Sequence, residues 1–412
     1  MKKLIISGII VALSITIATY VVSKQYNKPI YYQGKSEDAT FSTNFIKESH
    51  KTIDNKNYMI SPYSVEMALS MLRDGTKGET HSEISKVAPK RTIKTLSVKD
   101  KVNVANALFV KNKFKKDVRK DYSYNLKENY NAEFIYDDFK TPDVINNWVN
   151  KETNGMIKKI LDRMDDQFVL GLANAIAMEE EWQMPFTCEN TKKADFTTKS
   201  GEKYKVAMMN NTFEDTASYY ADDDAEAIIL PYKQYDYKTG KVVEEDGERL
   251  EFIGIIPKDI DKYINNLSLD TIKKIDQEKE TASSDIDIYL ELPRFSYSYD
   301  FKDFKKTLNN MGIETVFTPS ADLSGMLDNH DEAYVNEAIH KTYVKVDEVG
   351  TKAAAVTYFG VKDTAMPIDE KKHVSIVFDK PFIFMIKDTK TNEIAFFGVV
   401  YKPNKYENKS CE

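Results

Sequence analysis

The segment that most constrains this chain is residues 348–360, EVGTKAAAVTYFG, because it suits two different structures. The alanines after Thr351 favour a helix, which this threonine could cap. The same residues also alternate with period two, as a strand does. The pattern therefore predicts a segment that can serve both as a loop and as a buried strand. One face of that strand would carry only small or apolar side chains, namely Thr351, Ala353, Ala355, Thr357, Phe359 and Val361.

Predicted helices crowd the first third of the chain, and predicted strands fill most of the rest. Between residues 43 and 87 the apolar positions have helical spacing, and Pro62 after Ser61 suits the start of a helix. This segregation predicts an α+β fold with large, mostly antiparallel sheets. The strand candidates are FVLGLANAIAM, AEAIILPY, RLEFIGIIP, IDIYLELPRFSYSY, KTYVKVDE, HVSIVF, FIFMIKD and IAFFGVVY.

The charge of the chain limits its partners. With a formal net charge of −7 and a pI of about 5.6, the chain does not suit general binding of nucleic acid. Residues 111–121, KNKFKKDVRKD, carry six basic side chains. A solvated charged face is the favoured interpretation of this run, and a site for a polyanion or for membrane headgroups is the alternative.

The N-terminus predicts a membrane anchor. Lys2 and Lys3 precede 19 uncharged residues, Leu4–Val22, which as a helix would be about 28 Å long, close to the hydrocarbon thickness of a bilayer. We favour an uncleaved anchor over a cleaved signal peptide, since signal cores are shorter and an Ala-x-Ala-like site is missing. Either choice places the body of the chain outside the cytoplasm, at the membrane or secreted. The expected organisation is an anchor or signal in 1–23, a polar stalk in 24–42, a folded domain in 43–405 and a tail in 406–412.

The sequence offers no pattern typical of an enzyme. Its five histidines do not form a zinc-binding motif, and the chain lacks the glycine-rich phosphate and nucleotide motifs. A hydrolase built on Ser61 or Ser324 would lack a visible base and orienting group. The acidic run 221–226 is more typical of a solvated loop than of a cation site, so we expect no metal and no cofactor. Cys188 and Cys411 are expected to be thiols, and a single bridge between them is the alternative.

Several stretches, taken together and in order, resemble the serpin family. Residues 378–403, FDKPFIFMIKDTKTNEIAFFGVVYKP, resemble the C-terminal signature of serpins. Residues 338–357, AIHKTYVKVDEVGTKAAAVT, resemble the serpin strand that leads into the reactive-centre loop. The resemblance runs from about residue 43 to residue 403. Its other parts are NYMISPYSVEMALSMLRDGTKGETHSEI, INNWVNKETNGMI, LANAIAMEEEW, IILPY and MGIETVFTPSADLSGM.

This resemblance implies how the ambiguous segment is used. In an inhibitory serpin an exposed loop is the bait for a protease, and after cleavage it inserts as a strand into the main sheet. The hinge of the loop then needs glycine and small residues. The resemblance assigns the scissile bond to Thr364–Ala365, with Lys362–Asp363 as the next candidate. It assigns the hinge to Glu348, Gly350, Thr351, Ala353, Ala354 and Ala355.

The resemblance also implies a polar cluster beneath the sheet and a tryptophan where the hinge first inserts. The cluster, called the shutter in this family, maps onto Ser61, Ser64, Asn174 and His340, and the tryptophan, at the breach, is Trp182. Plain core packing is an equally compatible role for Trp182. Two features depart from the family pattern. Acidic residues 179–181 precede Trp182, and the stretch between the hinge and FDKPF is lengthened.

The resemblance implies a suicide-substrate inhibitor of serine proteases and not an enzyme. A small threonine before the scissile bond favours an elastase-like or subtilisin-like target. The expected protein is a monomer that meets the membrane through its N-terminal segment and does not bind nucleic acid. The alternative is a non-inhibitory binding or chaperone-like protein with the same fold.

Overall fold

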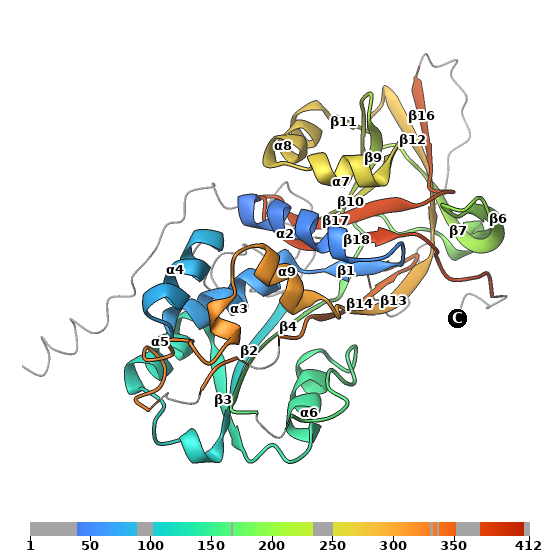
Figure 1. Cartoon of the computed structure of the whole chain (residues 1–412). Coiled ribbons are helices and arrows are strands. Elements are labelled where there is room, and N and C mark those ends of the chain that lie inside the picture. Colours follow the sequence, from blue (N-terminus) through green and yellow to red (C-terminus); the bar gives the residue numbers. More distant parts are fainter. Residues whose placement is uncertain are drawn as a thin grey trace, which may run out of the picture. The chain divides into compact units, whose positions relative to one another are not determined.

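Two apolar segments near the C-terminus form adjacent strands at the centre of the structure (Figure 1). In this computed structural model, β17 (Phe382–Asp388) and β18 (Ile394–Val400) are buried at every position. Strands covered on both faces need apolar side chains at successive positions, which explains FIFMIKD and IAFFGVVY. Both strands belong to a seven-stranded antiparallel sheet of order β1-β18-β17-β10-β9-β8-β11. Its other strands are β1 (Tyr58–Ile60), β8 (Ser218–Ala221), β9 (Ala225–Pro231), β10 (Leu250–Pro257) and β11 (Glu280–Thr281).

The structure describes residues 39–88, 102–165, 168–233, 250–329, 333–335, 338–351 and 371–407. All of these described residues lie in one compact unit, which spans residues 38–412. The predicted anchor, the hinge residues Ala353–Ala355 and both candidate scissile bonds (Thr364–Ala365 and Lys362–Asp363) therefore lie outside the described residues. Among the residues described, none of the helices combines the length and the apolar character that crossing a bilayer requires.

Three smaller sheets complete the strand content. One sheet has the order β16-β12-β7-β6, another β13-β14-β15-β5, and the third β3-β2-β4. Only β12–β16 and β2–β3 are parallel among the strand pairs of the described residues. The strands are β2 (Val102–Lys111), β3 (Ala132–Asp137), β4 (Leu170–Met178), β5 (Glu180–Glu181), β6 (Lys192–Thr197), β7 (Lys203–Phe213), β12 (Ile286–Pro293), β13 (Phe295–Asp300), β14 (Lys341–Val346), β15 (Gly350–Thr351) and β16 (Lys372–Val377).

Helices cover these sheets, and half of the helices of the described residues lie in the first third of the chain, where we expected them to crowd. Helix α3 begins where Pro62 predicted it, because the Ser61 side chain accepts a hydrogen bond from the Ser64 backbone N–H at 3.1 Å and so caps the helix. The α+β prediction is confirmed. The helices are α2 (Ala39–Thr52), α3 (Pro62–Asp74), α4 (Gly78–Val87), α5 (Lys120–Tyr130), α6 (Asp143–Glu152), α7 (Ile260–Asn266), α8 (Leu269–Glu278) and α9 (Phe304–Asn310).

The folded unit begins earlier than the predicted boundary at residue 43. Residues 39–42, expected in the polar stalk, form the first turn of α2. Phe41 is buried and stacks on Phe45 with 5.7 Å between ring centroids. The polar composition of the preceding stretch hid this turn, because a single buried aromatic residue is enough to fix a helix end against a core.

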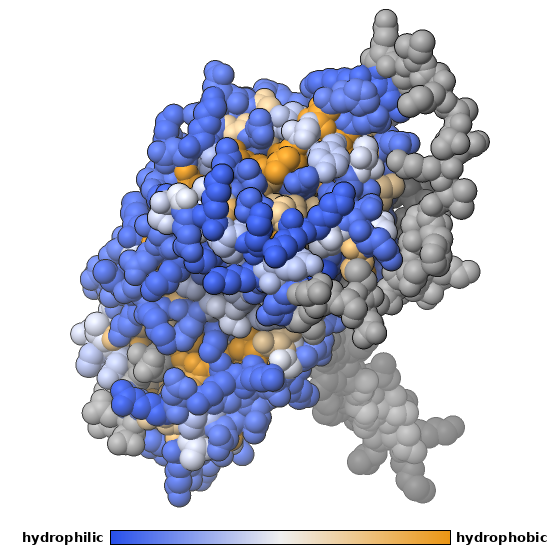
Figure 2. All heavy atoms as spheres, turned by 90° about the vertical axis from the view of Figure 1, so that its right-hand side faces the viewer, coloured by the Kyte–Doolittle hydropathy of each residue, from blue (hydrophilic) through white to orange (hydrophobic). Residues whose placement is uncertain are grey.

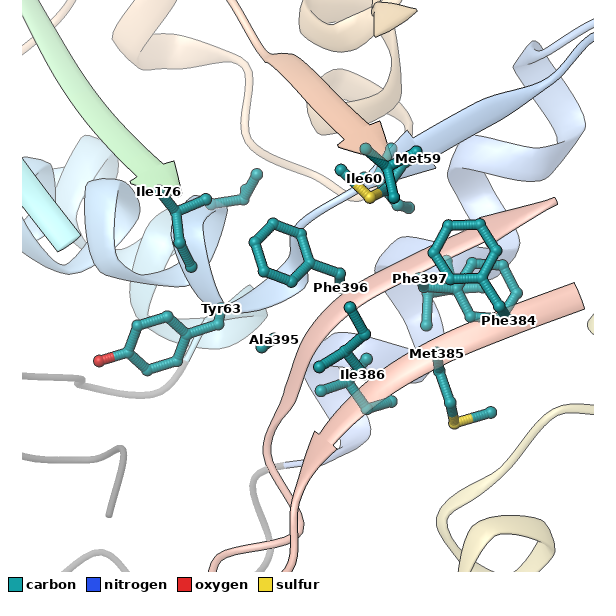
Figure 3. Close-up of a cluster of buried hydrophobic side chains, with 14 of the residues drawn as sticks. Met59, Ile60, Tyr63, Ile176, Phe384, Met385, Ile386, Ala395, Phe396 and Phe397 are labelled. Atoms are coloured by element: carbon teal, nitrogen blue, oxygen red, sulfur yellow. The ribbon is translucent and has the colours of Figure 1, made fainter. Parts of the chain in front are cut away.

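The core joins the sheets to one another. In Figure 3, Ile176 of β4 lies near Tyr63 of α3 and Phe396 of β18, while Met59 and Ile60 of β1 lie beyond them. The outer face shown in Figure 2 is mostly hydrophilic, with small apolar areas. Among the described residues, Tyr124 is the one large hydrophobic side chain that is exposed, at 51%.

The expectation of two free thiols is wrong, because Cys188 is disulfide-bonded. The chain's other cysteine, Cys411, lies outside the described residues. Before that point the C-terminal segment runs back beside β6 and β7. The Tyr406 N–H donates to the Lys205 carbonyl at 2.8 Å, and Lys193 lies 5.4 Å from the Tyr406 ring. Cysteine spacing could not predict this, since only the fold returns the C-terminal segment to the neighbourhood of Cys188.

Candidate functional site

Two residues of the predicted hinge form a short strand, β15, between β14 and β5. On one side Thr351 pairs with Val346 of β14. On the other side Gly350 pairs with Glu181 and Thr351 with Glu180, both antiparallel. The sequence argument expected insertion to follow cleavage of the loop. In the uncleaved chain, the first two residues already belong to the sheet.

Gly350 is required by a close approach of two backbones. A Cβ atom at this position would lie 2.0 Å from the Glu180 carbonyl oxygen and 2.7 Å from the Glu181 Cα. No side chain can be accommodated there unless the backbones move apart. The predicted need for glycine in the hinge is therefore met, and its physical cause is the contact with β5.

Thr351 is anchored beneath the sheet by aromatic residues. Its side chain is buried, and its hydroxyl lies 2.6 Å from the Tyr232 hydroxyl. The Tyr232 ring stacks on Trp182, with 4.8 Å between centroids and 11° between planes. Burial raises the pKa of Tyr232 well above its ordinary value, and the nearby Glu180 adds to this effect. The hydrogen bond between these two neutral hydroxyl groups therefore holds Thr351 in its buried position.

The turn before β15 is fixed by its own acidic residues. The Trp182 indole N–H donates to the Asp347 carbonyl at 3.0 Å, and the Trp182 backbone N–H donates to the Val349 carbonyl at 2.8 Å. The Glu348 carboxylate forms an ion pair with Arg294 and accepts a hydrogen bond from the Thr191 hydroxyl at 2.6 Å. Glu348 is buried, so this pairing satisfies a charge that would otherwise be costly.

The acidic residues before Trp182, which depart from the family pattern, lie beside the hinge. Glu181 lies in β5, and its carboxylate accepts a hydrogen bond from the Lys233 ammonium at 2.6 Å. Glu180 is buried directly across from Thr351. The departure from the family pattern therefore supplies the backbone partner of the hinge.

The predicted shutter residues form a second group, which is joined by hydrogen bonds and lies apart from the hinge contacts. The Ser61 N–H donates to His340 Nε2 at 3.0 Å, and the Ser61 hydroxyl donates to the Ala395 carbonyl at 2.6 Å. The Ser64 hydroxyl bonds the Asn174 side-chain oxygen. The Asn174 amide in turn donates to Asn106 at 2.6 Å. This chain of bonds connects α3 to both β4 and β2.

His340 is held in its neutral form. It is buried, and burial lowers its pKa to about 4. Because Nε2 accepts a hydrogen bond from the Ser61 backbone, the ring proton is assigned to Nδ1. His340 bonds the backbone of Ser61 and not its hydroxyl, so the two residues do not form the nucleophile and base of a hydrolase.

In the part of the chain that the structure describes, an unpaired gap between β4 and β14 extends from β15 toward Leu170, and we call the β15 end of this gap its upper end. Among the described residues, β4 and β14 belong to different sheets and share no strand pairing, and β15 pairs with β14 and with β5, which follows β4 in the chain. β4 pairs with β2 along its other edge, from Leu170 to Met178. Its free edge therefore faces the gap that leads down from the hinge.

The structure brings Glu348, Gly350, Thr351 and Trp182 together at the upper end of this gap, and Ser61, Ser64, Asn174 and His340 at the lower end. Sequence reasoning missed Asn106, Tyr232, Arg294 and Thr191. Asn106 could have been identified from the sequence, since it is a polar residue in the apolar strand ANALFV. Arg294 and Thr191 could not, because only the fold places them beside Glu348.

Comparisons with known proteins agree with this architecture. A sequence model of the serpin family, described as serine protease inhibitor, matches residues 36–403, and the chain belongs to this family. An uncharacterized serpin-like protein of Thermococcus kodakarensis is 31% identical over 373 residues, covering 85% of this chain and 82% of that protein. A leukocyte elastase inhibitor of Bos taurus is 29% identical, covering 84% of this chain and 93% of the inhibitor. The crystal structure of the thermophilic serpin tengpin in its native state has a TM-score of 0.75 at 27% identity, covering 91% of this chain and 97% of that one.

Proposed function

We propose that this serpin inhibits serine proteases as a suicide substrate, by inserting its cleaved loop into the gap between β4 and β14. The observation that carries the proposal is β15. Its two residues have the antiparallel orientation that a fully inserted strand would need, and they stand at the upper end of an open strand edge. Thr351 already turns its side chain into the interior, where Tyr232 binds it.

The pairing of β15 also predicts the register of the inserted strand. In both observed pairs the two residue numbers add up to 531, as in Thr351 with Glu180. Continued without a bulge, this register sets Ala353 opposite Met178 and Val361 opposite Leu170, the two ends of β4. Residues 353–361 therefore match the full length of the free edge. Thr357 would lie opposite Asn174 of the shutter.

Inhibition then follows from movement of the attached protease. The target's serine attacks the scissile bond and forms an acyl-enzyme. Insertion carries the acyl group away from the loop's original position, and the catalytic geometry needed for deacylation is lost. Insertion competes with deacylation in time, so the hinge must slide in without obstruction. The small residues from Thr351 to Ala355 meet this need.

We propose Thr364–Ala365 as the scissile bond, with Lys362–Asp363 as the alternative, and an elastase-like or subtilisin-like protease as the target. A small residue before the cut suits such pockets, and the similarity to a leukocyte elastase inhibitor supports the choice. We also propose that the chain acts outside the cytoplasm, held by its N-terminal segment or secreted. The disulfide at Cys188 supports an oxidising compartment.

The central test is Thr351→Arg. Incubation with a panel of serine proteases should give the parent protein an SDS-resistant covalent complex, and mass analysis of the released peptide should identify the cut. Thr351→Arg would place an unpaired charge next to Tyr232, at a cost of several kcal/mol. Its loop should be cut at the same bond and at a similar rate, yet it should form little complex.

The matched control is Lys352→Gln. In the register above, residue 352 lies opposite Glu179, which is exposed, so its side chain points away from the interior. Lys352→Gln should inhibit like the parent. Equal inhibition by Thr351→Arg would rule out strand insertion, and a parent protein that forms no complex with any protease would favour a non-inhibitory role. A released peptide beginning at Asp363 would move the cut and favour trypsin-like targets.

A further inference from the structure

A cavity lies between α6 and the open edge of β4, close to the lower end of the gap. Ile145 and Val149 of α6 line one wall, and Ile160 and Leu161 of the following segment line another. Residues 171–175 of β4 complete it. The cavity is partly open to solvent. Its apolar walls are typical of sites for small organic molecules.

The cavity reaches the edge of β4 and not only one of its faces. Successive residues of a strand point to opposite faces, and five consecutive residues, 171–175, contact this space. Ile339, which precedes β14, and Lys341, the first residue of β14, also line it. A molecule bound here would therefore lie between the two strands.

The cavity also carries more positive than negative charge. Its lining includes two cations, Arg163 and Lys341, and one carboxylate, Asp165. Arg163 is exposed and makes no ion pair with the residues described. The Lys341 ammonium donates to the Lys159 carbonyl at 2.7 Å, and a nearby carboxylate, that of Asp162, already pairs with Lys159. A guanidinium with free donors binds a carboxylate through two parallel hydrogen bonds.

We propose that this cavity binds an amphipathic carboxylate, such as a medium-chain fatty acid. The hydrocarbon chain would pack against the isoleucine and leucine side chains, and the carboxylate would lie at Arg163 and Lys341. A neutral apolar molecule would leave both cations unused, and an organic cation would meet repulsion.

Binding would compete with loop insertion, an extension that rests on the proposed function. In the register of β15, residues 171–175 would pair with loop residues 360 to 356. A ligand held between β4 and Lys341 occupies the space of those residues. Insertion would stall below the hinge, deacylation would win the competition, and the inhibitor would become a substrate.

The binding test uses sodium dodecanoate and the full chain, followed by titration calorimetry. One molecule should bind, and dodecyltrimethylammonium should bind more weakly. Ala173→Phe fills the cavity from β4 and should weaken dodecanoate binding at least about tenfold, since the hydrocarbon chain loses its buried contacts. Arg163→Glu, an exposed change that leaves the core intact, should weaken it about threefold to fivefold. Lys203→Glu, an exposed lysine of β7, is the matched charge control and should bind like the parent.

Protein whose loop has been cut and inserted should not bind dodecanoate, because the strand fills the gap. Absence of binding to the uncut protein, or unchanged binding by both Ala173→Phe and Arg163→Glu, would overturn the site. Binding that persists after insertion would show that the ligand does not share space with the strand, and would overturn the competition.

The two proposals fail in different ways. With dodecanoate present, the protease should release more cut loop and form less covalent complex, at an unchanged rate of cutting. A protein that forms complex but does not bind dodecanoate would retain the proposed function and lose this site. A protein that binds dodecanoate as described, yet forms no complex without it, would retain the site and lose the inhibitory mechanism.

Discussion

The two ends of the gap between β4 and β14 are held by different contacts. At the upper end, backbone pairing of β15, the Thr351–Tyr232 contact and the Trp182 hydrogen bonds hold the hinge in place. At the lower end, side chains from α3 and β4 hydrogen-bond beneath strands that do not pair. Among the described residues, the hinge pairs with the sheet at the upper end alone. In the proposed mechanism, the barrier to further insertion therefore lies in the lower half.

The largest effect should come from a single cut in the loop. Residues 353–361 would gain partners along β4, and at roughly 0.5–1.5 kcal/mol for each new hydrogen bond the gain is on the order of 10 kcal/mol. Calorimetry should show a rise in unfolding temperature on the order of 10 °C or more. Amide exchange should slow along 170–178 and change little at Trp182. An unchanged unfolding temperature would mean that the lower half stays open.

A large local effect is expected for Gly350→Val. The new Cβ would collide with the Glu180 carbonyl, so β15 should leave the sheet. Exchange of the Trp182 amide, which bonds the Val349 carbonyl, should accelerate at least about tenfold. The Ser61 amide, bonded to His340 at the lower end, is the internal control and should keep its exchange rate. If both amides respond equally, the two ends are one cooperative unit.

A moderate effect is expected from acid at the lower end alone. The pKa of His340 is depressed to about 4 in the folded protein, so the unfolded chain takes up the proton first as the pH falls below about 6.5. Stability present above pH 6.5 should decline toward pH 4, by about 2 kcal/mol between pH 7 and pH 5. Urea unfolding should give a flatter pH profile for His340→Asn. The same slope in both proteins would assign the acid sensitivity to other groups.

The smallest effect should come from Tyr232→Phe. This change removes the hydroxyl that binds Thr351 but keeps the ring stacked on Trp182. Loss of one buried hydrogen bond should cost about 1 kcal/mol, read as about fivefold faster exchange of the Trp182 amide. Thr351→Val should add no further loss in the double variant, since both changes break the same contact. An additive result would mean that each hydroxyl has another partner.

The patterns in the sequence predicted the fold class, and the resemblance of its motifs to serpins supplied most members of the two clusters. Short apolar runs such as FIFMIKD favour buried strands, and the alternation from Thr351 to Val361 has one small or apolar face whatever surrounds it. Ser61 followed by Pro62 marks the start of α3 by local chemistry alone. These features depend on residues that are close together in the chain, so they can be predicted from the sequence.

Only the tertiary structure decided that Gly350 and Thr351 of the hinge pair within the sheet. Whether Gly350 and Thr351 pair with β5 depends on the distance between two backbones and on Tyr232, which is far away in the sequence. The ion pair of Glu348 with Arg294 and the disulfide of Cys188 depend on the fold in the same way. The cavity beside β4 exists because α6 lies over an unpaired strand edge. Pairing, burial and cavities arise between segments that the chain order keeps apart, so local patterns cannot specify them.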